Sequence, residues 1–404
     1  MKFAETIVIG AGPAGLFAAI HCEKKPVLVL EKNGMAGKKL LLAGSGRCNM
    51  THHGNISEFM MHYGKNSRFM KTPLMTFDNE HLMAFFKVNG LNTYTDKNGK
   101  IFPITNNGGD VLKVLLQVCA ENNVAIAYNQ DVCGVEKQGD IFVISTGAKQ
   151  FSCTHLVIAT GGFSYPQTGS TGSGYRFANE LGHTIVQPKP ALAAVTSSTK
   201  NLAELAGVSL QNLLIYLYRR TRKIAEHRGD VVFTHKGVSG PGILDFSRYF
   251  EVGDVLKLNF TGLSPEDFRK YFMATAELEG KTSVLAFLKR FEIPRSVVLA
   301  LLRLCDVESF RTLATINRTD RGLIVQNFSE FAIKIIDIGG FAKAMVTAGG
   351  VKVNEVYTKT MESKLVKNLF FAGEVLDVDG DSGGYNLQAA FSTGHRAGKS
   401  ISQK

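Results

Sequence analysis

Apolar and polar residues recur along the chain with two different periods, one typical of strands and one typical of helices. An apolar run rich in β-branched residues ends at Ile9, residues 14–22 have the spacing of a helix, and residues 27–30 form a second short apolar run. Helical spacing returns over 55–90 and 111–121, and residues 155–158 again have the composition of a buried strand. Strands and helices that alternate in this way predict an α/β domain.

The pattern changes at Pro188 and Pro190. Short alternating segments dominate from residue 191 to about 262, including 213–218, 231–234 and 255–260, which is typical of an antiparallel barrel or sandwich. Ser264 followed by Pro265 predicts a helix N-cap with proline in the first turn, and it opens a helical stretch to about residue 319. Strand patterns return at 333–338 and 344–347, which we expect to close the barrel.

The composition agrees with a globular α/β protein, and the net charge adds information about possible partners. Of 404 residues, 45% are hydrophobic and 20% charged, as in ordinary soluble globular proteins, and no apolar run reaches the ~18 residues of a membrane span. The first residues enter a strand directly, so we expect a cytoplasmic protein with no membrane partner. The net charge of +11 favours a polyanionic partner such as nucleic acid, or else a solvated basic surface.

The six cysteines are scattered, without a CxxC pair. This spacing predicts neither a metal site nor a disulfide framework. We expect most of the thiols to be reduced and buried, with Cys48 as the exception.

The first glycine motif, GAGPAG at 10–15, lies between the first strand and the first helix. Gly10 permits the tight turn, Gly12 lets a pyrophosphate approach the backbone, and Gly15 allows helix and strand to pack closely. The helix N-terminus offers free N–H groups to phosphates. Glu31, at the end of the second strand, can accept hydrogen bonds from ribose hydroxyls and would repel a 2′-phosphate. The motif therefore predicts FAD or NAD rather than NADP.

Further glycine clusters follow. GSGRCN at 44–49 is either a plain turn or, as we favour, a second ligand loop in which Arg47 pairs with phosphate and Asn49 offers both a donor and an acceptor. ATGG at 159–162 follows a buried strand and returns the chain to the pyrophosphate. The glycines of 169–174 lack a preceding strand, so we expect no separate NAD(P)H domain.

The C-terminal segment decides between the two ligands. A buried strand ends at Gly373 and Glu374, where a carboxylate can face ribityl hydroxyls, and a helix opens after Gly384, Tyr385 and Asn386. The N-terminus of such a helix stabilises negative charge on a reduced flavin. The ligand predicted by both chain ends together is non-covalently bound FAD.

These motifs resemble a bacterial family of FAD-binding oxidoreductases that includes aminoacetone-oxidase-like proteins, BaiN-like flavoproteins and ribosomal RNA dihydrouridine synthases. The resemblance spans nearly the whole chain, with His52 where the family commonly has asparagine. It rests on the glycine motifs above and on GKIFP at 99–103, FTHKGVSGP at 233–241, TMESKL at 360–365, FAGEVLDVDG at 371–380 and GGYNLQAA at 383–390.

The predicted fold class is α/β, with a split Rossmann-type FAD-binding domain over 1–188 and 348–404. An antiparallel β-barrel substrate domain over 189–262 and 325–347 is inserted in it, and this domain carries a small helical subdomain over 263–324. The resemblance implies FAD contacts at Gly10, Gly12, Gly15, Glu31, Arg47, Asn49, Thr160, Gly161, Gly373, Glu374 and Asn386. Neighbouring positions are predicted to line the same site: Ala14, Lys32, Ser45, Gly46, Cys48, Gly162, Asp377, Gly384 and Leu387. Val132, ahead of a hairpin, is predicted on position alone to hold the adenine.

Two enzymatic functions and one non-enzymatic function remain open. Reduced FAD would pass a hydride from N5 to C6 of a uridine in ribosomal RNA, giving dihydrouridine, or it would act on a small amine or enone. The third hypothesis is a non-catalytic flavin-binding protein. Candidate proton donors are Cys48, His235 and Tyr385, and NAD(P)H is the expected transient electron donor. The basic run at 218–223, with His227 and Arg228, is either an RNA-facing patch or a solvated hairpin.

Overall fold

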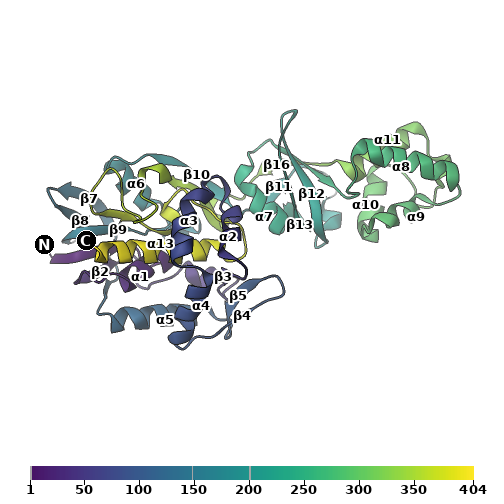
Figure 1. Ribbon diagram of the computed structural model, residues 1–404. Helices are drawn as coiled ribbons and strands as arrows, with labels where there is room; N and C mark the ends of the chain where they lie inside the picture. The colour runs from purple at the N-terminus through teal and green to yellow at the C-terminus, as the bar shows by residue number, and fades with distance from the viewer. Residues whose placement is uncertain (1, 148, 200–201) are drawn as a thin grey trace. The chain divides into compact units, whose positions relative to one another are not determined.

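The computed structural model describes residues 2–147, 149–199 and 202–404 (Figure 1). The chain forms two compact units, one of Met1–Ala191 with Phe341–Lys404 and the other of Leu192–Gly340. The first unit is therefore built from both chain ends, with the second unit inserted between its halves.

The first unit contains a mixed sheet in the order β6-β2-β1-β9-β8-β7, and β18 pairs with β9. β1 is parallel to both neighbours, with Val8 opposite Val29 on one side and Val157 on the other. Where both faces of the sheet are covered, the strands are continuously apolar rather than alternating, as in β2 and in the last three residues of β1 and β9. The strands are β1 (Lys2–Ile9), β2 (Val27–Leu30), β6 (Ala125–Ala127), β7 (Val132–Gln138), β8 (Ile141–Thr146), β9 (Gln150–Ile158) and β18 (Leu369–Phe371).

Helices and two small sheets complete this unit. The order of one small sheet is β3-β5-β4, and β10 pairs with β17 in the other. The small-sheet strands are β3 (Thr51–His52), β4 (Thr93–Thr95), β5 (Lys100–Pro103), β10 (Ile185–Ala191) and β17 (Val346–Val351). The helices are α1 (Pro13–Ile20), α2 (Ile56–Phe59), α3 (Ser67–Thr76), α4 (Asn79–Val88), α5 (Gly108–Glu121), α6 (Ser173–Glu180) and α13 (Tyr385–Ser402), and α12 (Gly340–Lys343) stands at the unit boundary.

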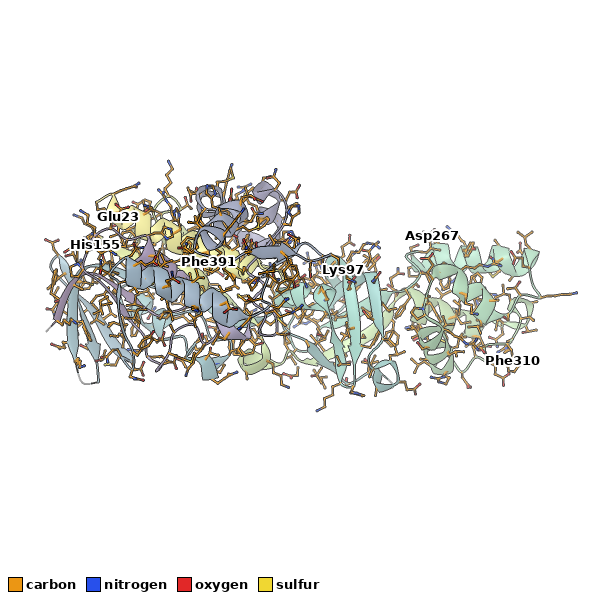
Figure 2. All side chains as sticks on the ribbon, turned by 90° about the horizontal axis from the view of Figure 1, so that it is seen from below. Glu23, Lys97, His155, Asp267, Phe310 and Phe391 are labelled. Atoms are coloured by element: carbon orange, nitrogen blue, oxygen red, sulfur yellow. The ribbon has the colours of Figure 1, made fainter. Side chains whose placement is uncertain are left out.

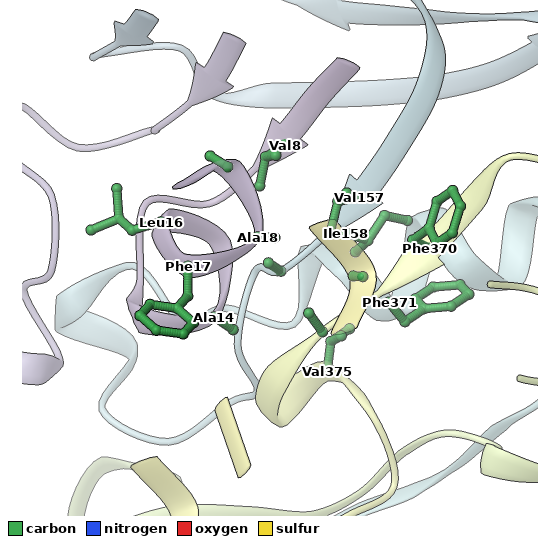
Figure 3. Close-up of a cluster of buried hydrophobic side chains, with 14 of the residues drawn as sticks. Val8, Ala14, Leu16, Phe17, Ala18, Val157, Ile158, Phe370, Phe371 and Val375 are labelled. Atoms are coloured by element: carbon green, nitrogen blue, oxygen red, sulfur yellow. The ribbon is translucent and has the colours of Figure 1, made fainter. Parts of the chain in front are cut away.

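The first and last helices, α1 and α13, lie against each other (Figure 1). An ideal Cβ at Gly394 would stand 2.4 Å from the Ala14 carbonyl oxygen, so only glycine allows this approach. The ring centroids of Phe17 and Phe391 lie 5.0 Å apart in an edge-to-face contact. Figure 3 shows Phe17 among the buried side chains around β1, β9 and β18. The two ends of the chain thus share one hydrophobic core.

The second unit contains a closed antiparallel barrel in the order β11-β14-β13-β12-β15-β16. Along β12, Ile215 and Leu217 are fully buried, while Tyr216 between them and Tyr218 after them are partly exposed. This period of two separates an apolar interior from a polar exterior. The elements are β11 (Val195–Ser197), β12 (Ser209–Arg219), β13 (Arg222–Thr234), β14 (Gly237–Ser239), α7 (Pro241–Phe246), β15 (Val255–Asn259) and β16 (Phe331–Asp337).

A helical subdomain lies in the sequence between β15 and β16; Asp267 and Phe310 belong to it (Figure 2). The predicted N-cap is confirmed, because the Ser264 hydroxyl accepts a hydrogen bond from the Asp267 N–H at 3.1 Å. The helices are α8 (Pro265–Leu278), α9 (Val284–Leu288), α10 (Arg295–Leu304) and α11 (Arg318–Ser329). Within the described residues, no helix combines the length and apolar character needed to cross a membrane.

The predicted fold class is confirmed, with one difference at the barrel's edge. We expected residues 344–347 to close the barrel, but β17 pairs with β10 inside the first unit, with Ala191 opposite Val346. The strand predicted at 333–338 does close the barrel, because β16 pairs with β15 and β11. The compact units accordingly divide after residues 191 and 340 rather than near 188 and 347. Sequence periodicity identifies a strand but not its partner, which is why this assignment failed.

Candidate functional site

The first glycine turn has the geometry expected of a dinucleotide site. Gly10 has a φ of 104°, and an ideal Cβ at Gly15 would stand 1.9 Å from the Gly10 carbonyl oxygen. An ideal Cβ at Gly12 meets nothing within 4 Å. Gly12 is the N-cap of α1 and supplies no capping side chain, so the first N–H groups of the helix remain available to an anion. Gly10 and Gly15 thus serve packing, whereas Gly12 borders open space.

Glu31 is buried, and its carboxylate is held in place. Its Oε2 accepts a hydrogen bond from the Ala11 N–H at 2.9 Å, and its Oε1 accepts from the Asn33 N–H at 2.8 Å and from Asn33 Nδ2 at 2.7 Å. A carboxylate has about four lone-pair sites, so acceptor capacity remains for ribose hydroxyls. Asn33 was missed by the sequence analysis, since a lone asparagine after a strand carries no motif signal. Next to Glu31, Lys32 Nζ donates to Thr171 Oγ1 at 2.9 Å.

The GSGRCN loop is a run of left-handed residues rather than a plain turn. Gly44, Ser45, Gly46 and Cys48 all have positive φ, and the Gly46 carbonyl accepts a hydrogen bond from the Gly108 N–H at 2.8 Å. The Arg47 guanidinium lies 4.6 Å from the centroid of the Phe102 ring. Consecutive residues with left-handed backbone conformations are strained, and such strain is typical of loops that contact ligands.

Two polar side-chain atoms near this loop are buried without a hydrogen-bond partner in the described part of the chain, Asn49 Oδ1 and Thr51 Oγ1. An unpaired buried acceptor costs about 1–3 kcal/mol. A bound ligand with a donor group offsets that cost. The orphaned oxygen at Asn49 therefore fits the predicted FAD contact there.

The expectation that Cys48 would be the exposed cysteine is wrong. Cys48 is fully buried, and burial raises the pKa of its thiol to about 12, whereas Cys133 on β7 is exposed. The left-handed backbone at Cys48 turns its side chain inward, against the position where α5 begins at Gly108. At neutral pH this thiol is protonated and uncharged.

Segments distant in sequence meet around the first glycine turn. An ideal Cβ at Gly10 would stand 2.6 Å from the Ala159 carbonyl, beside Thr160, and one at Gly373 would stand 2.7 Å from Ala14 Cβ. The Gly373 N–H donates to Thr393 Oγ1 of α13 at 2.9 Å. The structure therefore brings the GAGPAG, ATGG and Gly-Glu motifs to one place. Gly161, with a φ of 73°, stands beside Ser170.

The Glu374 carboxylate, expected to face ribityl hydroxyls, is held largely by the protein. Its Oε1 accepts from Ser164 Oγ and from the Thr347 N–H, each at 2.8 Å, and its Oε2 pairs with Lys39 Nζ at 2.5 Å. Gly162 leaves room for this cluster, because an ideal Cβ there would stand 3.0 Å from Glu374 Oε1. Lys39, Ser164 and Thr347 were missed, since their positions along the chain show no relation to Glu374.

We expect Glu374→Gln to lower the free energy of unfolding of the apoprotein by about 2 kcal/mol, because the Lys39 ammonium then faces an amide instead of a carboxylate. Urea unfolding measures this loss. Glu23→Gln is the matched control, since Glu23 makes an exposed ion pair with Lys399 at 2.9 Å and its loss should change little. Equal losses in both variants would contradict the role of the Glu374 cluster.

The N-terminus of α13 is uncapped by any side chain, as expected for a helix that faces a ligand. Its N-cap is Gly384, with a φ of 106°, where an ideal Cβ would meet the Thr51 carbonyl at 2.4 Å. The Tyr385 ring is nearly parallel to those of His52 and His62, at centroid distances of 5.2 and 4.0 Å. His62 Nδ1 contacts Asp381 Oδ2 at 2.9 Å, which ties the preceding loop to this stack.

The side chain of Asn386, a predicted FAD contact, makes hydrogen bonds within the protein. Asn386 Oδ1 accepts from the Gly380 N–H, and Nδ2 donates to the carbonyls of Gly380 and Asp381. The side chain thus closes the loop before α13, which leaves the backbone of Asn386 and Leu387 at the helix N-terminus as the predicted contact. Asp377 is buried and accepts from Asn66 Nδ2 at 2.9 Å.

Two predicted residues lie apart from these motifs. Val132 begins β7, is buried, and pairs with Thr146 of β8, so the hairpin expected there is present. His235 is exposed in the turn between β13 and β14 of the second unit. Their roles in adenine binding and proton transfer stay predictions.

The chain is similar to known proteins over nearly its whole length. It is 29% identical over 412 residues to a ribosomal RNA dihydrouridine synthase of Haemophilus influenzae, covering 100% of both chains. It is also 29% identical over 408 residues to a 3-dehydro-bile acid delta(4,6)-reductase of Clostridium scindens, covering 98% of both. A 3-ketosteroid-delta4-(5alpha)-dehydrogenase from Rhodococcus jostii shares the fold at 15% identity, with a TM-score of 0.51 over 100% of this chain and 97% of that one.

A Rossmann domain completed by both chain ends, with the motifs for FAD assembled in it, defines an FAD-dependent oxidoreductase. The chain belongs to the HI0933-like protein Rossmann domain family, whose family model matches residues 4–400.

Proposed function

We propose that this protein reduces a uridine of ribosomal RNA to dihydrouridine. The observation that carries the proposal is the end-to-end match to a protein named ribosomal RNA dihydrouridine synthase, which covers both units. The net charge of +11 supports it, because an RNA substrate is a polyanion.

When bound, FAD supplies the redox chemistry: a hydride adds to C6 of uracil and a proton to C5, so the C5=C6 bond becomes single while the reduced flavin loses two electrons. The residues of this chain would bind and orient that cofactor. The N–H groups at the start of α1 would hold the pyrophosphate, and Glu31 the ribose. The α13 N-terminus would stabilise negative charge at the flavin. We propose NAD(P)H as the electron donor.

The C5 proton needs a donor that stays protonated until it is used. The Cys48 thiol stays protonated at neutral pH, because burial raises its pKa to about 12, but its side chain is fully buried. The Tyr385 hydroxyl and the exposed His235 imidazole are the other candidates. Single variants Cys48→Ala, Tyr385→Phe and His235→Gln distinguish them, since only the donor's loss should abolish product while FAD binding persists.

The direct test measures dihydrouridine by mass spectrometry in ribosomal RNA from cells with and without the gene. Purified protein with FAD, NADPH and the undermodified RNA provides the second arm. We expect the modification to disappear in the deletion strain and to be restored by the purified protein. Unchanged dihydrouridine in both arms would contradict the proposal.

A second function is favoured by the match to a bile acid reductase, which covers 98% of this chain. In this alternative the substrate is a small conjugated ketone, and the same hydride-plus-proton addition saturates its C=C bond. NADPH consumption with a panel of enones, in the absence of RNA, would identify it.

A further inference from the structure

The longest hairpin of the barrel lies in the described part of the second unit and joins β12 to β13. Its tip is Arg220 and Thr221, and Arg220 has a φ of 56°. The two strands stay paired to the end of the hairpin, with Arg219 opposite Arg222, after a register shift between Leu217 and Tyr218. The exposed tip therefore presents a run of cationic side chains on a rigid support.

One of these cations, Arg219, makes ion pairs within the barrel unit. Arg219 donates from Nε and Nη2 to the two oxygens of Asp254, each at 2.9 Å, and Nη1 lies 2.9 Å from Glu251. Asp254 is buried, so the pair anchors the hairpin to the segment that leads into β15. Arg219 is neutralised and is unsuitable as a phosphate contact.

The next two arginines differ from it. Arg220 and Arg222 are exposed, and neither has an ion pair or a side-chain hydrogen bond within the described residues. Arg228, farther along β13, donates to the Asn212 carbonyl at 3.3 Å and pairs with no carboxylate of the described chain. Positive charge without a carboxylate partner is thus concentrated at the tip of the hairpin.

Aromatic rings lie next to this charge. Tyr216 and Tyr218 alternate with the buried Ile215 and Leu217, so both rings are on the outer face of β12. Lys223 Nζ lies 4.3 Å from the Tyr216 ring centroid, and Lys257 Nζ lies 4.4 Å from that of Tyr218. Both lysines are also paired with carboxylates, Lys223 with Glu226 at 2.7 Å and Lys257 with Glu330 at 3.2 Å. The charge available to a ligand beside the rings is therefore that of the arginines at the tip. Partly exposed aromatic rings next to such arginines suit a ligand that has both phosphates and flat bases.

We propose that the β12–β13 hairpin is an RNA-binding surface, in which Arg220 and Arg222 contact phosphates of a single-stranded segment and the Tyr216 and Tyr218 face lies against its bases. This inference rests on the proposed function. It names the surface that holds the polyanion, which the reaction at the flavin does not require. An acidic protein segment would pair with the arginines, but its carboxylates would not stack on the tyrosine rings as bases do.

The test compares Arg220→Ala/Arg222→Ala with Arg269→Ala/Arg295→Ala, a control that removes the same charge from exposed arginines of α8 and α10. Fluorescence anisotropy with labelled oligouridine RNA measures affinity across a salt series. We expect the hairpin variant to bind about 10-fold more weakly, with the slope of log K against log salt reduced by about 1.4, since each single-strand phosphate contact contributes about 0.7. The control should keep the wild-type affinity and slope, and both variants should melt as the wild type does.

The outcomes separate the two proposals. If the wild type binds and reduces RNA while the hairpin variant binds it equally well, the hairpin assignment is overturned and the proposed function stands. If the wild type neither binds nor reduces RNA, the proposed function fails and the hairpin assignment fails with it. Arginine-dependent binding of polyglutamate as tight as that of RNA would assign the hairpin to an acidic protein and overturn the RNA proposal.

Discussion

Gly12→Ala should fold like the wild type and yet bind FAD about 10- to 100-fold more weakly. In the protein without ligand an added methyl at Gly12 meets nothing within 4 Å, so the apoprotein should keep its stability. The same methyl occupies the space where a pyrophosphate approaches the start of α1, and such overpacking costs about 1–3 kcal/mol. Flavin fluorescence titration gives the affinity, and thermal unfolding of the apoprotein gives the stability.

Gly15→Ala, three residues away, is the matched comparison with the opposite expectation. Its methyl would stand 1.9 Å from the Gly10 carbonyl oxygen, so α1 and β1 must separate, at a cost of about 3 kcal/mol or more. The apoprotein should therefore lose stability before any ligand is added. If Gly12→Ala destabilised the apoprotein as much as Gly15→Ala, or bound FAD normally, the division of roles in this turn would be wrong.

We expect the second large effect, a loss of folding stability, when the pH is lowered. His21 and His395 lie at the interface of α1 and α13, with ring centroids 4.6 Å apart. Burial lowers the pKa of His21 to about 4, with a smaller effect from Lys399, and burial together with the His21 charge lowers the pKa of His395 to about 3. His395 Nδ1 has no hydrogen-bond partner among the described residues. Both rings are therefore neutral in the folded protein at neutral pH.

The sign of the pH dependence follows from these lowered values. In the unfolded chain the His21 imidazole is protonated near pH 6.5, whereas in the folded chain it is protonated only near pH 4. The neutral ring therefore causes no loss of stability above pH 6.5, and the free energy of unfolding falls as the pH drops toward 4. For His21 alone the loss approaches about 3 kcal/mol. Urea unfolding at a series of pH values measures it.

His395→Leu should flatten this pH profile, since it removes one buried ring and its repulsion of the other. His53→Gln, at an exposed histidine, should leave the slope unchanged and serves as the control. A profile that is equally steep in wild type and His395→Leu would show that other groups, such as carboxylates, cause the acid loss.

The sequence by itself determined the ligand class and the architecture. Roles for Gly10, Gly12, Gly15 and Glu31 are predictable because a tight turn, a close approach and a ribose contact each need one residue type at one spacing. The period of two along β12 and the cap at Ser264 are likewise local properties, so the barrel and the helical subdomain were predictable. Local chemistry was enough for these features.

Only the tertiary structure decided which residues meet across the chain. Glu374 pairs with Lys39, 335 positions away, and β17 leaves the barrel for β10, because packing selects partners that periodicity cannot identify. The same holds for burial: Cys48 turns inward through a left-handed backbone. Asp254 neutralises Arg219, while Arg220 beside it has no ion pair with any residue that the structure describes. Charge and exposure depend on neighbours in space, and the order of residues along the chain does not contain them.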